Sequence, residues 1–277
     1  MTHTAHLKDR RLLKVSGADC VEFLQNLITC EVASLDPGAS RFGALLTPQG
    51  KILFDFFVLR EADGYLLDVD AGQADALAQR LTFYKLRAAV DISADPRSVF
   101  ASWPDGEGVS DARTASMGTR HYGETIPANA TLAQWHGHRI GIGVPHLGLD
   151  FDPGENFPHD VLMDQFDHPG VDFRKGCYVG QEVVSRMEHR GTARSRFVKV
   201  MGDQPLPPKG EPLALDGRRV GTLGSSVDCQ GLALVRLDRA GQASDSRPIL
   251  IDGSKVTLSL PEFVSFDWPE TEAGFNE

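Results

Sequence analysis

The sequence predicts an α+β fold that ends in a small antiparallel β-barrel. Helical and strand-like patterns are mixed in the first third of the chain and do not alternate strictly, which disfavours a doubly wound sheet. After Gly191 the pattern changes to short apolar runs separated by Gly, Asp and Pro, which is typical of a small barrel. With 277 residues, of which 41% are hydrophobic, the chain can form one large domain or two to three smaller ones.

The predicted first domain, residues 1–95, combines helices with a β-meander. Residues 16–32 predict a helix that begins at Ser16, because apolar residues recur there at helical spacing. Residues 41–70 predict a meander whose turns are TPQG and EADG. The segment QADALAQRLTFYKL predicts a second helix, and AAVDI predicts a returning strand.

The predicted second domain, residues 96–191, is rich in loops. One short helical piece is expected over 160–166. A stronger helix is expected from about Gly180 to Arg190, with Gly191 as its C-terminal cap. The barrel then occupies residues 192–277, and its acidic tail, which ends in PETEAGFNE, is expected to fray.

Charge and hydropathy exclude several classes of partner. The net charge of −10 disfavours direct nucleic-acid binding, because phosphate recognition needs a basic stripe. No apolar stretch approaches the roughly 20 residues of a membrane span. The N-terminal MTHTAHLKDRRLLKV resembles neither a signal peptide nor a matrix-targeting leader, so a soluble cytoplasmic protein is expected.

The four cysteines, Cys20, Cys30, Cys177 and Cys229, lie far apart and form no C-x-x-C pair. A zinc ribbon or a four-cysteine cluster cage is therefore not expected, and we predict no permanently bound metal. A reducing compartment would also disfavour disulfides. The interpretation favoured for all of them except Cys177 is a small buried hydrophobe.

Two pairs of polar residues leave alternatives open. His136 and His138 could form a metal site on a strand, but QWHGHR is polar and solvated histidines are favoured. Asp68 and Asp70 could be paired carboxylates for proton transfer, but a solvent-facing strand edge is favoured. The segment GIGVPHLG lacks the third glycine of a dinucleotide-binding loop.

The stretch RKGCYVGQEVVSRMEHRG, residues 174–191, is the strongest candidate site. Cys177 lies just before a predicted helix start, where the helix dipole favours an anion. Lys175 adds a positive charge two residues away, and both effects favour a thiolate. Gly176 and Gly180 permit close ligand approach. On spacing alone, a reactive thiol and an inert cysteine are equally supported.

The segment KGCYVGQE, residues 175–182, resembles the signature of the YgfZ family. The flanking VVSRMEHRGTAR, the N-terminal FLQNLITCEV and FGALLTPQGKILFDF, and GRRVGTLGSSV in the barrel are similar as well, so that the resemblance covers nearly the whole chain. These are folate-binding, aminomethyltransferase-like proteins that take part in iron–sulfur cluster assembly and repair. The resemblance implies three domains around a central channel, the first two interleaved with each other, as in the T-protein of the glycine cleavage system.

The resemblance also implies tetrahydrofolate or a related folate in that channel, with Cys177 as the functional thiol. Candidate cofactor-binding residues are those of the signature together with nearby basic side chains: Lys175, Gly176, Tyr178, Gly180, Gln181, Glu182, Lys85 and Arg190. The implied partners are iron–sulfur enzymes or cluster-assembly proteins. Some of the family's client enzymes modify transfer RNA, which would make an effect on tRNA indirect.

Three functions stay open at this point. The first is a folate-dependent factor that maintains iron–sulfur enzymes. The second is a one-carbon transferase, although KGCYVGQE lacks the phenylalanine of the aminomethyltransferase motif and DAGQAD replaces their Asn-Ala motif; Asp75 or Asp55 would be its acid. The third is a non-catalytic scaffold. Whether the protein turns over any substrate is left open.

Overall fold

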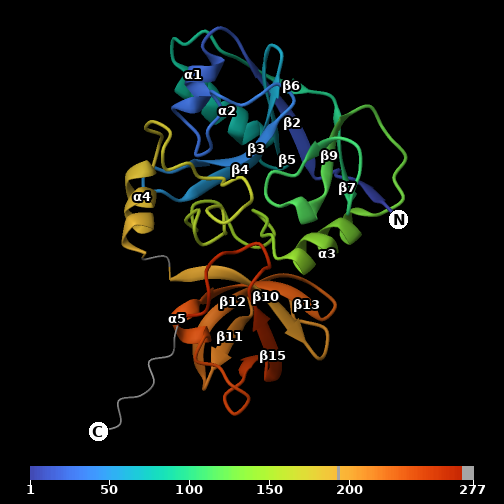
Figure 1. Cartoon of the computed structure of the whole chain (residues 1–277), viewed down its shortest axis with the longest axis vertical. Coiled ribbons are helices and arrows are strands. Elements are labelled where there is room, and N and C mark those ends of the chain that lie inside the picture. Colours follow the sequence, from blue (N-terminus) through green and yellow to red (C-terminus); the bar gives the residue numbers. More distant parts are fainter. Residues whose placement is uncertain (192–193, 270–277) are drawn as a thin grey trace.

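The computed structural model describes residues 1–191 and 194–269. Two antiparallel sheets with their helices form one half of the molecule, and a β-barrel forms the other (Figure 1). The expected fraying of the tail concerns residues 270–277, which lie outside the described residues, as do residues 192–193 at the predicted domain boundary. Within the described ranges, no helix is both long and apolar enough to cross a membrane.

The larger sheet has five antiparallel strands, and two helices cover one of its faces. A core of aliphatic and aromatic side chains fills the space between that face and the helices. The meander predicted over 41–70 is confirmed as three consecutive strands. The strands in spatial order, followed by the helices, are β3 (Ser40–Leu46), β4 (Ile52–Glu61), β5 (Gly64–Asp70), β2 (Arg10–Ser16), β6 (Asp91–Asp95), α1 (Cys20–Gln25) and α2 (Ala74–Lys85).

The second sheet has four strands and takes its first strand from the start of the chain. β1 (His3–His6) pairs with β7 (Ser98–Trp103), so the chain begins in this sheet, builds the larger sheet and then returns. This crossing gives the two α+β units an interleaved topology, whereas their division at residue 95 stays a prediction. The remaining elements are β8 (Val109–Ser110), the short 3-10 helix η1 (Ala115–Met117), β9 (Thr119–Gly123), α3 (Leu132–Ile142) and α4 (Gln181–Arg190).

The barrel is closed, and its six strands surround an apolar interior. Closure leaves no unpaired strand edge, which is how small all-β units protect their backbone polar groups. The predicted C-terminal barrel is therefore confirmed. Its elements in chain order are β10 (Ser195–Gly202), β11 (Pro212–Leu215), β12 (Arg218–Val227), β13 (Gln230–Arg236), α5 (Leu237–Ala240), β14 (Ile249–Ile251) and β15 (Ser254–Ser259).

Two predicted helices differ from the structure. The helix expected from Ser16 is limited to Cys20–Gln25, and Ser16 is instead the last residue of β2. The chain turns at Gly17 (φ +106°), where a Cβ atom would lie 2.2 Å from the carbonyl oxygen of Ala89. The helix expected over 160–166 is a series of turns, and Leu162 has a φ of +67°, which a right-handed helix does not tolerate.

Helix α3 was not predicted, because its two internal glycines lower helix propensity. A local signal was present: the Thr131 side chain accepts a hydrogen bond from the backbone N–H of Gln134, whose side chain in turn accepts one from the backbone N–H of Thr131. This reciprocal pair is a capping box, which marks a helix start. The prediction that places His136 and His138 on a solvated strand is therefore wrong, because both lie half-buried on this helix.

Candidate functional site

The signature segment, residues 175–182, is held against the turn between β3 and β4. Gly180 has a φ of +81°, and a Cβ atom there would lie 2.5 Å from the carbonyl oxygen of Thr47. Gly50 in the same turn also has a positive φ (+80°), and its Cβ position lies 3.2 Å from the Val184 side chain. Backbone approach thus requires the glycine at 180, and the positive φ favours glycine at both positions. The TPQG turn and the start of α4 form one packed unit at the edge of the molecule (Figure 1).

Lys175 points into the protein. Its Nζ donates hydrogen bonds of 2.7 Å to the carbonyl oxygens of Ile28 and Cys30, in the segment that follows α1. The ammonium also lies 5.5 Å from the centre of the Tyr178 ring. Burial lowers the pKa of Lys175. The structure therefore shows Lys175 as an anchor for the signature segment, and its predicted role in favouring a Cys177 thiolate stays a prediction.

Cys177 differs from the other cysteines by its exposure. Cys20 and Cys30 are buried, as predicted, while Cys229 is only half-buried, so the burial prediction is incomplete there. Burial raises the pKa of the Cys30 thiol to about 12, which keeps it protonated and inert. Cys177 is exposed, between an anchored lysine and the start of α4. A Cβ atom at neighbouring Gly176 would meet nothing within 4 Å, so packing does not require that glycine.

The other predicted cofactor residues do not converge on one hollow. Tyr178 is buried, and its hydroxyl has no hydrogen-bond partner among the described residues. Gln181 and Glu182 form the first turn of α4, where Glu182 pairs with Arg186 in solvent.

Lys85 and Arg190 lie apart from each other. The Lys85 ammonium donates to the carbonyl oxygen of Val90 (2.8 Å), and the residue lines an open hollow of about 510 Å³ together with Phe23 and Leu27. Arg190 is the last residue of α4 and lies about 14 Å along the helix axis from Gln181, at a rise of ~1.5 Å per residue. Only Lys175 to Glu182 therefore form a local group.

A buried network of charged side chains joins the two sheets. Asp68 accepts hydrogen bonds of 2.6 Å from both Arg10 and Arg120. Arg120 also contacts Asp111, whose carboxylate is held by Arg113 at 2.8 and 2.9 Å. Burial alone would raise the pKa of Asp111, but these two arginines lower it to about 2. The interpretation of Asp68 as a solvent-facing residue is therefore wrong: its side chain is 1% exposed.

Asp55 lies beside this network and is a buried carboxyl whose pKa is strongly shifted. It lines a small cavity of about 10 Å³, together with Arg10, Arg113, Arg139 and His146, which is room for about one water molecule. In the described ranges no group hydrogen-bonds its carboxylate. Burial raises the pKa of Asp55 from the usual 3.8 to about 6. Such a carboxyl can take up or release a proton near neutral pH.

Replacing Asp55 with asparagine is expected to stabilise the protein at neutral pH. A raised pKa in the folded state means that the favourable contribution of the protonated carboxyl is complete below about pH 4 and is lost as the pH rises through about 6. Asparagine does not ionise, so Asp55→Asn should gain up to about 3 kcal/mol near pH 7.5, for a shift of about two units. Urea unfolding at several pH values tests this, and a stability difference that is the same at pH 4 and pH 7.5 would contradict it.

Arg139 connects the central cavity to the barrel. It is fully buried, and its guanidinium donates to Asp150 (2.7 Å), to the carbonyl oxygen of Val144 (2.9 Å) and to Ser225 of β12 (2.8 Å). Asp150 in turn accepts hydrogen bonds from the Ser225 backbone N–H (2.8 Å) and hydroxyl (2.6 Å). This closed set of contacts fixes α3 against the barrel. Nothing in the sequence around Arg139 or Asp150, other than their charges, indicates this pairing.

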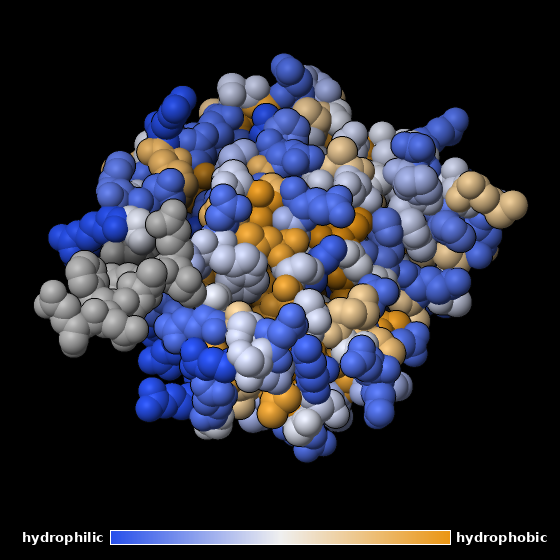
Figure 2. Space-filling model, turned by 60° about the horizontal axis from the view of Figure 1, so that its bottom comes forward, coloured by the Kyte–Doolittle hydropathy of each residue, from blue (hydrophilic) through white to orange (hydrophobic). Residues whose placement is uncertain are grey.

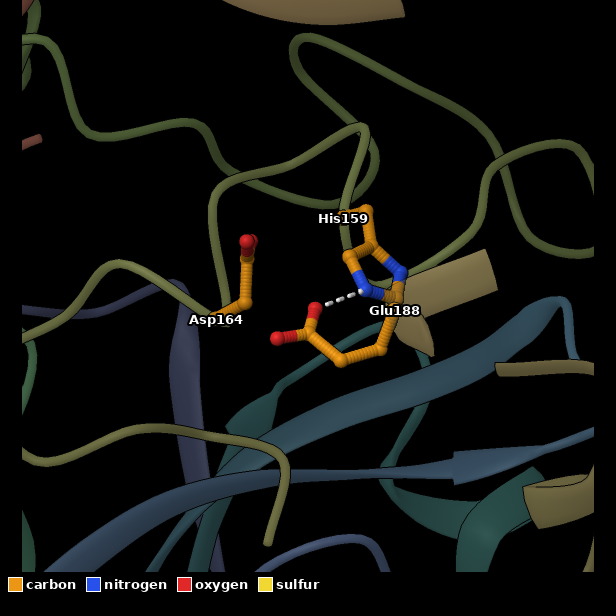
Figure 3. A group of neighbouring side chains, drawn as sticks. All are labelled: His159, Asp164 and Glu188. Atoms are coloured by element: carbon orange, nitrogen blue, oxygen red, sulfur yellow. Dashed lines mark hydrogen bonds and ion pairs between the residues drawn. The ribbon is translucent and has the colours of Figure 1, made fainter. Parts of the chain in front are cut away.

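One further group has the composition of a metal site. His159, Asp164 and Glu188 place one ligand atom each within 4.8 Å of the others, and Figure 3 shows Glu188 between the other two. His159 Nε2 lies 3.0 Å from Glu188, and Asp164 accepts hydrogen bonds from Arg196 (2.6 Å) and Gln165 (2.7 Å). A metal would have to compete with Arg196 for Asp164. Among the described residues, the Nδ1 of His159 also lacks the partner that a metal-bound histidine usually has.

Comparison with known proteins places the chain in a family. It is 31% identical to the human protein called iron–sulfur cluster assembly factor IBA57, mitochondrial, over 95% of this chain and 84% of that protein. The chain belongs to the IBA57 family. The mouse member is 30% identical over 96% of this chain and 85% of its own length. The homologue from Neurospora crassa is 29% identical, but this chain spans 52% of its length. Residues 194–266 match the family model described as the CAF17 C-terminal beta-barrel domain.

The fold has a close counterpart among solved structures. The glycine cleavage system aminomethyltransferase T from Bartonella henselae superimposes with a TM-score of 0.74 over 96% of this chain and 88% of that one, at 18% sequence identity. The predicted α+β, T-protein-like fold with a C-terminal barrel is thereby confirmed. At this identity the likeness concerns the fold alone.

The expected cytoplasmic location is contradicted by these relatives. The human, mouse and Neurospora members of the IBA57 family are all called mitochondrial. The prediction relied on the composition of the N-terminal segment and on the lack of long apolar stretches. A lack of long apolar stretches disfavours a membrane span but does not report the compartment of a folded protein.

Proposed function

We propose that this member of the IBA57 family is an assembly factor for iron–sulfur clusters and that it acts through Cys177, as YgfZ-like proteins would. The observation that carries the proposal is that the signature segment is anchored while its cysteine is exposed. Lys175 and Gly180 are fixed by the Ile28 and Cys30 carbonyls and by Thr47, and between them the thiol of Cys177 faces solvent. A positioned, accessible thiol is what cluster chemistry requires.

Cluster binding by this chain would have to be shared. A four-cysteine cage needs four thiolates close together, and Cys177 has no C-x-x-C partner in the sequence. The open space at Gly176 would let a partner protein approach the thiol closely. We therefore propose a cluster-assembly protein or an iron–sulfur enzyme as the partner at Cys177. Effects on tRNA modification would then be indirect and would follow from the state of such client enzymes.

Tetrahydrofolate binding is a second part of the proposal, which rests on the resemblance of the signature. The central cavity, at about 10 Å³, is too small to hold a pterin as it stands, and the candidate basic residues lie on different elements. Binding in this cavity would require its lining side chains, among them Arg10 and Arg113, to move. Calorimetric titration with tetrahydrofolate tests this part separately, and no heat of binding at high ligand concentration would remove it.

The main experiment is a complementation test. Cells that lack their own IBA57-family factor should regain the activity of iron–sulfur enzymes when they express this chain with the targeting segment of the protein that it replaces. Unchanged protein levels of the apo-enzymes would show that the gain is in cluster content. If the chain is expressed and folded but enzyme activity stays at the level of the deletion cells, the proposed function is wrong.

A folate-dependent one-carbon transferase is the second candidate, and Asp55 is the observation that favours it. A buried carboxyl with a pKa raised to about 6 suits proton transfer to a bound pterin amine. The test is turnover of an aminomethyl donor by purified protein with tetrahydrofolate. Turnover that disappears in Asp55→Asn and persists in Cys177→Ala would favour the transferase over the assembly factor.

A further inference from the structure

The barrel carries an open hollow that is lined mainly by charged side chains. It has a volume of about 960 Å³ and lies between the β11–β12 turn, helix α5 and the segment that precedes β14. In Figure 2, strongly hydrophilic side chains crowd the lower left, which is the side on which α5 lies in Figure 1. Four arginines and two aspartates line the hollow: Asp216, Arg218, Arg219, Asp238, Arg239 and Arg247.

We call this hollow the barrel groove. Its lining contains more arginine than acidic residues. Four guanidinium groups face two carboxylates, so the lining carries a net positive charge on a chain whose net charge is −10. Asp216 is paired with Arg247, and Asp238 is held by two hydrogen bonds from Arg236, which lies beside the groove. Both carboxylates are therefore already neutralised by partners.

Two arginines of the groove keep their guanidinium groups available. Arg218 and Arg239 are exposed, and their guanidinium groups make no hydrogen bond or ion pair to any group in residues 1–191 and 194–269. Arg219 donates to the Thr222 hydroxyl and to the Gly221 carbonyl oxygen, which fixes it at the rim. The turn at Asp216 and Gly217, with φ of +49° and +75°, brings Arg218 to the start of β12.

We propose that the barrel groove binds a compact anion with two or more phosphate groups. A guanidinium presents its N–H groups as a planar fork that matches two phosphate oxygens, and two free forks in one hollow can hold adjacent phosphates. The volume suits a small molecule. A long polyanion such as RNA is disfavoured, because it would extend over the acidic remainder of the surface. Among the described residues no aromatic side chain lines the groove, so the phosphates and not a base are the recognised part.

Calorimetric titration of the full chain with inorganic tripolyphosphate tests the proposal. We expect saturable one-to-one binding that weakens as salt is added. Arg218→Ala and Arg239→Ala should each weaken binding about tenfold, since each removes a charge-assisted fork. Arg239→Lys keeps the charge but loses the fork, so its affinity should fall between those of wild type and Arg239→Ala. ATP should bind as tightly as tripolyphosphate, since the phosphates are recognised.

A matched control separates a built site from general attraction. Arg80 is an exposed arginine on α2, outside the groove, and Arg80→Ala removes the same charge. Circular dichroism should show that all variants stay folded, because the replaced side chains are exposed. The proposal is overturned if tripolyphosphate shows no saturable binding at millimolar concentration, if Arg80→Ala weakens binding as much as Arg239→Ala, or if an RNA oligonucleotide displaces tripolyphosphate.

Discussion

Replacing Cys177 with alanine is expected to abolish most of the function and to leave the fold intact. The side chain is exposed, so its removal should change the free energy of unfolding by less than about 0.5 kcal/mol. The activity of iron–sulfur enzymes restored in deletion cells should fall ~tenfold or more, because alanine can neither ligate iron nor react as a thiolate. Enzyme activity in cell extracts and thermal unfolding of the purified variant measure the two effects.

Cys229→Ala is the matched control for this prediction. Cys229 is a half-buried cysteine of the barrel, remote in sequence from the signature segment, and its removal deletes the same sulfur atom. Cells with this variant should regain the enzyme activity that wild type restores. Equal losses for Cys229→Ala and Cys177→Ala would mean that total thiol content matters and that the position of Cys177 does not.

Replacing Arg139 with methionine is expected to give the largest loss of stability. The substitution leaves the buried Asp150 carboxylate without its ionic partner and leaves the Val144 carbonyl with one hydrogen bond fewer. Breaking a buried ion pair by removing one partner costs about 3–5 kcal/mol. Because Arg139 also donates to Ser225, the contact between α3 and the barrel should loosen as well. Denaturant unfolding followed by tryptophan fluorescence measures the loss.

Arg186→Met is the control for the Arg139 substitution. Arg186 pairs with Glu182 at 2.7 Å on the surface of α4, and its side chain is 57% exposed. Surface pairs of this kind contribute less than about 1 kcal/mol, so the variant should unfold at nearly the wild-type denaturant concentration. The account of the buried network is wrong if both variants lose the same stability.

Much of the fold could be predicted because its signals are local. The meander over 41–70, helix α2 and the barrel strands follow from alternation, helical spacing and turn residues. Helix α4 was found from its apolar face and from Gly191, which indeed adopts the left-handed conformation at the C-terminal cap. Helix α3 is not predicted although its capping box is local, because Gly137 and Gly141 lower the helix propensity of the segment.

The parts that could not be predicted depend on contacts between distant residues. Asp68 alternates with Asp70 on one strand, yet Asp68 is buried by Arg10 and Arg120 from two other strands. Asp55 is perturbed because the second sheet and α3 close over it. Lys175 has its role through the carbonyls of Ile28 and Cys30, almost 150 residues earlier in the chain. Nothing in local spacing reports such partners.

Cluster delivery with purified components tests directly whether the exposed thiol of Cys177 is the functional group. An apo-enzyme is incubated with a cluster-loaded assembly protein and with wild type, Cys177→Ala or Cys229→Ala, and the recovery of enzyme activity is followed over time. Wild type and Cys229→Ala should accelerate the recovery of enzyme activity equally, and Cys177→Ala should give the rate seen without the factor. Recovery with Cys177→Ala as fast as with wild type would show that the exposed thiol of the signature segment is not the functional group.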